Sequence, residues 1–300
     1  MKKLLAFAIF FISTLYADDN VFYRAPGPLL ALSGTTQPKG TFSIQPYFYM
    51  TNTNIESPRF PDTYGKTLQI PIQYGISDFF DVRVSVQGMY TEKYGQKYLG
   101  PMDTMTAISF QVYKKNTAIR LMLFEMWPTG NYRNLKPHKL GIDGIGEGSF
   151  QTCIALFITQ PFNKRFTMYG NFFYYAYSNV KVNGFNFYGG GYGTKGIVNP
   201  GNIIEGIITG ELSISKRVAL TCDIMYLYRL PTSFKGINGK NPDGTEASSS
   251  MPYKFQLSIA PGLEYSFTDS FGISGGAWFA THNRNCIDFM TGIIALYYSY

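Results

Sequence analysis

Hydrophobic and polar residues alternate with a period of two along most of this 300-residue chain. The clearest case is residues 253–267, where the odd-numbered positions are apolar and the even-numbered positions are polar or small. Successive side chains of a β-strand point to opposite faces, so this pattern predicts a strand with one apolar and one polar face. The same alternation recurs in residues 67–76, 203–214 and 218–229.

We expect about twelve strands from this pattern. They cover residues 41–50, 67–76, 80–90, 104–113, 117–127, 147–160, 165–177, 202–214, 217–230, 253–266, 271–281 and 288–300. Short turns, such as residues 77–78 and 215–216, alternate with long connections, such as residues 128–146 and 231–252. An even number of strands with short turns at one end and long loops at the other is typical of bacterial outer-membrane barrels.

The composition agrees with a barrel whose solvent is lipid. Only 15% of the residues are charged and 17% are aromatic, whereas an average soluble domain carries about 25% charged residues. The sequence has no apolar stretch long enough for a transmembrane helix. The sequence therefore predicts an all-β fold, a transmembrane up-and-down antiparallel barrel over residues 41–300. Its apolar face would contact lipid and its polar face would line the interior.

The first residues predict export. Lys2 and Lys3 precede an apolar run that ends at Leu15, and two acidic residues follow Ala17. This is the pattern of a secretory signal peptide over residues 1–17. Together with the barrel, it predicts location in the outer membrane of a Gram-negative-type bacterium.

Residues 18–40 precede the first strand, and their proline and glycine residues oppose a helix. They form either a periplasmic segment or a plug inside the barrel. Leu29, Leu30 and Leu32 would be unusual in a free tail, so we favour a plug.

The last strand carries an expected assembly signal. Leu296, Tyr298 and Tyr300 share one face, and the sequence stops on an aromatic residue. Outer-membrane barrels commonly end in this way, and we expect the barrel-assembly machinery to recognise these residues. The other expected partners are outer-membrane lipid, lipopolysaccharide and small solutes, and we expect a monomer.

Charged residues on the polar faces are the candidate lumen lining. They are Asp81, Arg83, Arg120, Glu147, Glu205, Glu211, Asp223, Arg229, Lys254 and Glu264. Such charges either line an aqueous path and set its selectivity or pair with one another and fill a narrow barrel. Both interpretations remain open at this point.

Aromatic residues are dense in residues 172–177 and 185–192. Girdles at the two membrane interfaces would explain most of them. The alternative is a surface on which aromatic solutes stack.

Several short passages resemble one known family. Residues 68–76 read Leu-Gln-Ile-Pro-Ile-Gln-Tyr-Gly-Ile, residues 128–130 read Pro-Thr-Gly, and residues 144–148 read Gly-Ile-Gly-Glu-Gly. Residues 260–265 and 275–278 complete the likeness. Together they resemble the outer-membrane transporters of the meta-pathway of phenol degradation. The resemblance implies passage of hydrophobic or aromatic compounds and carries over no catalytic residues.

The sequence has few residues that could act as a catalytic base or nucleophile. The chain has two histidines, His138 and His282, and neither has a serine at the spacing of an outer-membrane lipid hydrolase with a His–Ser–Asn arrangement and calcium. A general base needs its nucleophile within hydrogen-bond reach. We therefore expect no enzyme activity, no metal and no cofactor.

Two further patterns have structural explanations. Residues 191–196 match G-x-G-x-x-G, but a Pro-Gly pair and a strand follow instead of the helix that a dinucleotide site needs. Cys153, Cys222 and Cys286 have neither zinc-site spacing nor an even number. The net charge of +7 is not clustered into a nucleic-acid face.

The sequence thus favours an outer-membrane channel for passive passage of small solutes, hydrophobic or aromatic ones among them. One alternative is a filled barrel that acts as a surface-exposed structural or interaction protein. A lipid hydrolase is the third and weakest hypothesis.

Overall fold

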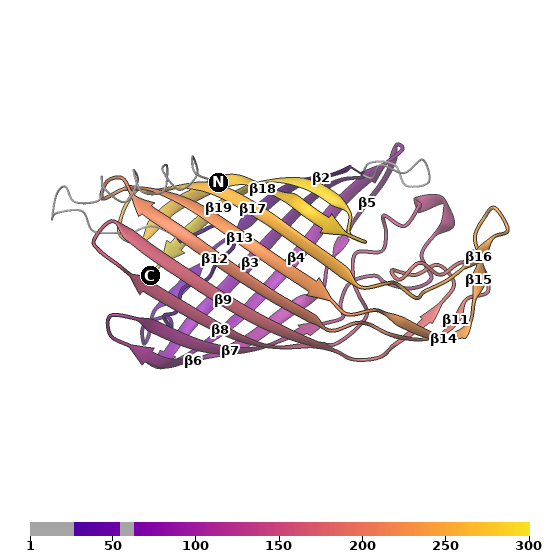
Figure 1. Ribbon diagram of the computed structural model, residues 1–300, viewed down its shortest axis with the longest axis horizontal. Helices are drawn as coiled ribbons and strands as arrows, with labels where there is room; N and C mark the ends of the chain where they lie inside the picture. Colours follow the sequence, from indigo (N-terminus) through magenta and orange to yellow (C-terminus); the bar gives the residue numbers. More distant parts are fainter. Residues whose placement is uncertain (1–26, 55–62) are drawn as a thin grey trace, which may run out of the picture.

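The computed structural model describes residues 27–54 and 63–300, so the predicted signal peptide, residues 1–17, lies outside the described residues. The described chain forms a closed barrel of twelve antiparallel strands (Figure 1). The first strand is split into β1 (Phe42–Ile44) and β2 (Tyr47–Asn54). The others are β3 (Thr63–Ser77), β4 (Phe80–Lys93), β6 (Thr104–Lys114), β7 (Ala118–Trp127), β8 (Gln151–Pro161), β9 (Phe166–Tyr177), β12 (Ile203–Ser213), β13 (Val218–Arg229), β17 (Lys254–Ser266), β18 (Phe271–Arg284) and β19 (Asp288–Ser299).

The barrel closes between the first and last strands. Tyr49 of β2 pairs with Ile293 of β19, and Ser43 of β1 pairs with Ser299. Every other strand of the barrel pairs with its neighbours in the chain. Closure leaves no sheet edge, so the backbone polar groups of the wall have ladder partners, as a lipid environment requires. The predicted all-β antiparallel barrel is confirmed.

Alternation decides which side chains point inward. On the paired strands β12 and β13, Ile208 and Ile224 are 53% and 50% exposed, whereas Thr209 and Asp223 are fully buried. The exposed apolar residues of these strands form the outer surface of the wall, and Thr209 and Asp223 point into the interior. The strand boundaries follow the predicted ranges within a few residues at most ends.

One predicted boundary is wrong in a way that affects the site. The strand expected over residues 147–160 begins at Gln151. Gly148 has a φ of +71°, and Gly146 lies so close to Gly130 that a Cβ would come within 2.6 Å of its carbonyl carbon. This backbone cannot continue a strand, so Glu147 lies in the connection before β8.

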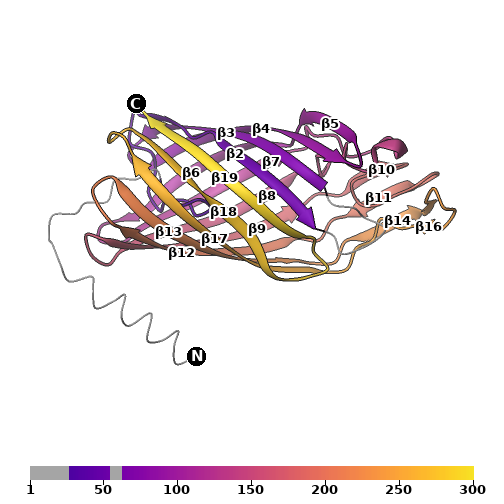
Figure 2. The same ribbon diagram turned by 90° about the horizontal axis from the view of Figure 1, so that it is seen from above.

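The two ends of the barrel differ. Short turns and the start of β1 lie at one end, which we call the short-turn end, and the long connections lie at the other, the long-loop end (Figure 1). There β10 (Val180–Asn183), β11 (Lys195–Asn199) and β14 (Ser233–Ile237) form a separate sheet (Figure 2). The pairs β15 (Gly239–Lys240) with β16 (Glu246–Ala247), and β4 with β5 (Gln96–Pro101), extend the same end.

The long connections thus contain strands that were not among those predicted from the sequence. Val180, Val182, Tyr188 and Val198 form a buried cluster within them. Within residues 27–54 and 63–300, the only helical element is the short 3₁₀ helix η2 (Pro137–Lys139). No helix in that part of the chain is long and apolar enough to cross a membrane.

Candidate functional site: the barrel lumen

Residues 27–37 lie against the inner wall near the short-turn end. Their backbone is held by side chains that point inward from several strands. The N–H of Ala31 donates to Asp223 Oδ1 (3.2 Å), that of Leu32 to Asn171 Oδ1 (2.6 Å) and that of Gly34 to Thr159 Oγ1 (2.8 Å). Inward side chains of the wall thus replace the sheet partners that this non-strand segment lacks.

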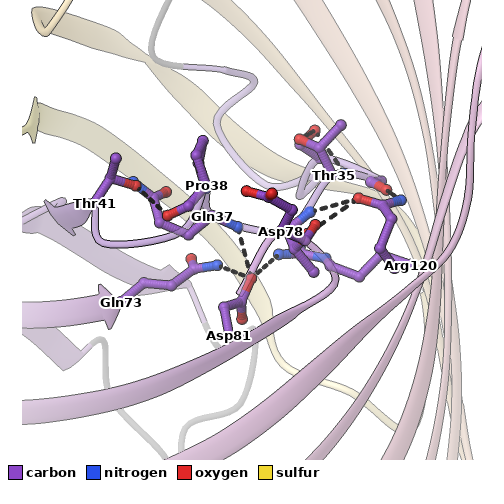
Figure 3. Close-up of polar contacts among 12 residues, drawn as sticks. Thr35, Gln37, Pro38, Thr41, Gln73, Asp78, Asp81 and Arg120 are labelled. Atoms are coloured by element: carbon purple, nitrogen blue, oxygen red, sulfur yellow. Dashed lines mark hydrogen bonds and ion pairs between the residues drawn. The ribbon is translucent and has the colours of Figure 1, made fainter. Parts of the chain in front are cut away.

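The same segment continues toward β3 and β4. The N–H of Thr36 donates to Gln111 Oε1 (2.9 Å). The N–H of Gln37 donates to Asp81 Oδ2 (2.8 Å), as Figure 3 shows. The buried carboxylate of Asp81 also accepts a hydrogen bond from Gln73 Nε2 at 2.7 Å. The polar side chains of this end of the lumen are therefore committed largely to holding the segment.

Glycines make the close packing of the segment possible. Leu29 is 2% exposed and packs on Gly262 and Gly276, where an added Cβ would come within 2.8 and 2.5 Å of its Cδ1. A Cβ on Gly34 would come within 2.4 Å of the Ala118 carbonyl oxygen. Larger residues at these positions would push the segment off the wall.

Two of the predicted lumen cations lie near Asp81 at this end. Arg83 on β4 and Arg120 on β7 are buried, and Arg120 Nη1 lies 4.0 Å from Asp81 Oδ2 (Figure 3). The guanidinium carbon of Arg120 lies 4.7 Å from the centre of the Phe157 ring, which is a cation–π contact.

Three acids occupy another arc of the wall, on β12, β13 and β17. Glu211 accepts a hydrogen bond from Tyr169 Oη (2.8 Å), Asp223 from Thr209 Oγ1 (2.5 Å), and Glu264 from the N–H of Gly27 (3.3 Å). All three carboxylates are fully buried.

The middle of the lumen is aromatic. Phe157 and Phe173 meet edge to face with centroids 5.4 Å apart, and Phe124 meets Tyr175 in the same way at 5.5 Å. These rings belong to an inward cluster with Ala107, Met122, Cys153 and Ala155. Further inward aromatic residues are Tyr169 on β9 itself, Tyr47 and Tyr49 on β2, and Trp278 on β18.

This lining corresponds to the alternative interpretation of residues 172–177, which the sequence assigned mainly to girdles. Outward and inward positions alternate within the run: Phe172 is 50% exposed, whereas Phe173 belongs to the inward cluster. The same alternation that identified the strand contains this signal, because the odd positions of β9 also include the buried Asn171.

Glu147 and Arg229 meet near the long-loop end. Arg229 Nη2 lies 2.7 Å from Glu147 Oε2, and its guanidinium lies over the Tyr177 ring at 4.7 Å. Tyr188 donates from its hydroxyl to the Glu147 carbonyl oxygen at 2.8 Å. Burial raises the pKa of Tyr188, so this hydroxyl keeps its proton and remains a donor.

Asp103 fixes the loop that carries Glu147. Its Oδ1 accepts the N–H of Gly130 and its Oδ2 accepts the N–H of Glu147, both at 2.9 Å. Burial raises the pKa of Asp103, although both hydrogen bonds oppose that rise. Thus Glu147 reaches Arg229 from a connection held at two points.

The remaining predicted residues are spread along the wall. Glu205 and Lys254 are partly buried on inward positions of β12 and β17. Leu296 and Tyr298 face outward on β19, and the Tyr300 side chain is 86% exposed. The structure therefore brings Asp81 together with Arg120, and Glu147 together with Arg229, while the rest form no single cluster.

The residues considered for catalysis lie apart from the lumen charges. His282 lies within β18, and the centre of its ring is 5.7 Å from that of Phe255. His138 lies in η2. The three cysteines are free, and within residues 27–54 and 63–300 no group of three or more His, Cys, Asp or Glu side chains could hold a metal ion.

Comparison with known proteins supports the fold. No protein-family model matches the sequence, and no curated protein is significantly similar to it. The structure is similar to the COG4313 outer membrane channel from Pseudomonas putida F1, with a TM-score of 0.68, 11% identity, and coverage of 91% of this chain and 99% of that one. Two others superpose less well and carry no weight. They are the KdgM porin in complex with disordered oligogalacturonate (TM-score 0.44, 10% identity, 86% of this chain and 99% of that one) and the CymD monoaromatic hydrocarbon channel (0.45, 6%, 88% and 88%).

The strand order, the outward apolar face and the first of these similarities define the class of fold. The described residues form a closed antiparallel barrel with the fold of outer-membrane barrels.

Proposed function

We propose that this protein is an outer-membrane channel through which small solutes, hydrophobic or aromatic ones among them, pass by diffusion. The short-turn end would face the periplasm and the long-loop end the cell exterior, as in other barrels of this class. The outward apolar residues would contact membrane lipid, and lipopolysaccharide would surround the long-loop end.

The aromatic middle of the lumen is the observation that carries this proposal. A barrel that served only as a scaffold could fill its interior with packed aliphatic side chains or paired charges. Here Phe173 and Tyr175 remain partly exposed between two polar ends. Partly exposed rings on an inner wall offer faces and edges to a passing aromatic solute. The similarity to an outer membrane channel and the family resemblance of the sequence support the same function.

The buried contacts of residues 27–37 favour a second candidate. If these residues close the lumen permanently, the protein is a filled barrel whose long loops contact partners at the surface. The hydrogen bonds from Ala31, Gly34 and Gln37 to the wall are the observations in its favour.

Swelling of proteoliposomes tests the proposed solute class. Phenylalanine and leucine carry the same charges and differ in the ring, so their relative entry rates report on the aromatic lining. We expect liposomes that contain residues 18–300 to swell faster in phenylalanine than in leucine. Phe173→Leu should reduce this preference because it removes an inward ring.

A matched control exists one residue earlier. Phe172→Leu makes the same chemical change on the outward face, where the side chain is 50% exposed, and should leave the preference unchanged. Liposomes that swell no faster than empty ones in either solute would favour the filled barrel. Equal effects of the two substitutions would contradict the role of the lining.

A further inference from the structure

A cavity of about 410 Å³ lies near the short-turn end, between residues 27–38 and the wall. Its volume is in the range of small-molecule sites. Three of the side chains that line it are cationic, Arg83, Lys114 and Arg120, and none of the lining side chains from residues 27–54 and 63–300 is acidic.

Arg83 is the distinctive member of this lining. It is 8% exposed, and it makes no hydrogen bond or ion pair with any residue in the described ranges. Its Nε is buried without a partner, and so is the Nε of Arg120. A buried guanidinium that makes no direct hydrogen bond or ion pair is costly, because it has lost water without gaining a bonded partner.

Asp81, the acid on the same strand as Arg83, already bonds to other residues. Asp81 accepts hydrogen bonds from Gln37 and Gln73, and its ion pair is with Arg120, two strands away. Arg120 is further fixed by the Phe157 ring beneath it. The Asp81 carboxylate therefore bonds to residue Gln37 of the segment and pairs with Arg120, whereas Arg83, which also lines the cavity, has no such partner among the described residues.

The other walls of the cavity indicate the body of the ligand. Tyr47, Tyr169, Tyr297 and Pro71 contribute flat, mostly apolar surfaces. Arginine binds a carboxylate through two parallel hydrogen bonds in one plane. A ligand with one carboxylate and a flat ring would thus satisfy both Arg83 and these walls.

We propose that this cavity binds a small aromatic monocarboxylate, with its carboxylate on Arg83. This proposal rests on the proposed function and extends it: carboxylated aromatic compounds would be solutes that bind near the short-turn end of the lumen. Arg120 and Lys114 add positive charge around the bound anion. The binding itself does not require that the lumen be open.

Isothermal titration of benzoate into detergent-solubilised residues 18–300 tests the site. We expect saturable binding that Arg83→Gln weakens by ~10-fold or more, since that change removes both the charge and the planar pair of donors. Arg83→Lys, which keeps the charge and disturbs folding least, should also weaken binding. Arg217→Gln, on an exposed turn of the same end, is the matched control and should bind as the unchanged protein does.

Two competitors define the ligand class. Benzyl alcohol has the ring without the carboxylate, and inorganic phosphate has the charge without the ring, so both should bind much more weakly than benzoate. Absence of benzoate binding, equal affinity for either competitor, or unchanged affinity in both Arg83 variants would overturn the proposal. Because binding in detergent is independent of passage, a protein that conducts without binding benzoate refutes this site alone. A protein that binds benzoate without conducting refutes the channel alone.

Discussion

Gly34 illustrates how one residue decides where residues 27–37 lie. Its N–H bonds to Thr159, and its Cα is so close to β7 that a Cβ would lie 2.4 Å from the Ala118 carbonyl oxygen. The obstacle is backbone of the wall, which cannot move aside as a flexible side chain would.

Gly34→Val should therefore displace the segment from the wall. The N–H groups of Leu32 and Gly34 are protected by hydrogen bonds to Asn171 and Thr159, and we expect their hydrogen–deuterium exchange to rise by ~10-fold or more when local opening is favoured. Mass spectrometry of the peptide that covers residues 27–37 measures this change. Ser33→Ala is the control, since its hydroxyl bonds to Thr35 within the segment. Unchanged exchange in Gly34→Val would show that the close approach does not hold the segment.

At the scale of the elements, odd and even positions along each strand face different surroundings, the outer surface of the barrel and its interior. Ile208 and Thr209 are neighbours on β12, yet the first is 53% exposed on the outer face and the second is fully buried inside. An arginine on the lipid face near the middle of a barrel destabilises it by about 2–4 kcal/mol, and the cost falls toward the interfaces.

Ile208→Arg should lower the free energy of unfolding in lipid vesicles by about 2–4 kcal/mol, measured by urea titration. Ile237→Arg places the same residue on β14 in the long-loop sheet, where Ile237 is 67% exposed. It should change the unfolding free energy by much less. Equal losses at both positions would contradict the placement of the outer face of β12 in lipid.

The same alternation explains what could be predicted from sequence. It located all twelve wall strands, because a two-faced strand leaves a period-two pattern whatever its neighbours are. It did not locate β10, β11 and β14, since these strands are short and the buried contacts of Val180 and Val198 come from segments distant in sequence. A local pattern does not encode such pairings.

The candidate site was less predictable than the fold. The charged positions could be listed, but which of them meet depends on register: Glu147 reaches Arg229 across 82 positions of sequence from a loop, not from a strand. The burial of Arg83 without a partner depends equally on where Gln37 and Asp81 lie. Period-two alternation predicts on which face of a strand a residue lies, but it does not predict which residues of other strands or loops that residue contacts.

At the scale of the whole molecule, the lumen has three zones in series. A segment-filled polar zone occupies the short-turn end, an aromatic zone the middle, and the Glu147–Arg229 pair with its tyrosines the long-loop end. Passage of solute requires a path past residues 27–37. Conduction through the barrel therefore depends on whether these residues leave such a path or move to open one.

Single-channel conductance of residues 18–300 in a planar bilayer tests this claim most directly. The conductance is compared with that of a variant that lacks residues 18–36. This variant keeps the turn at Gly40, whose N–H donates to the Gly75 carbonyl oxygen at 2.8 Å. We predict small, steady conductance for the longer chain and a clear increase for the shortened one, because the polar zone is then emptied. A folded barrel that conducts in neither form would contradict the channel and leave the filled barrel as the function of this fold.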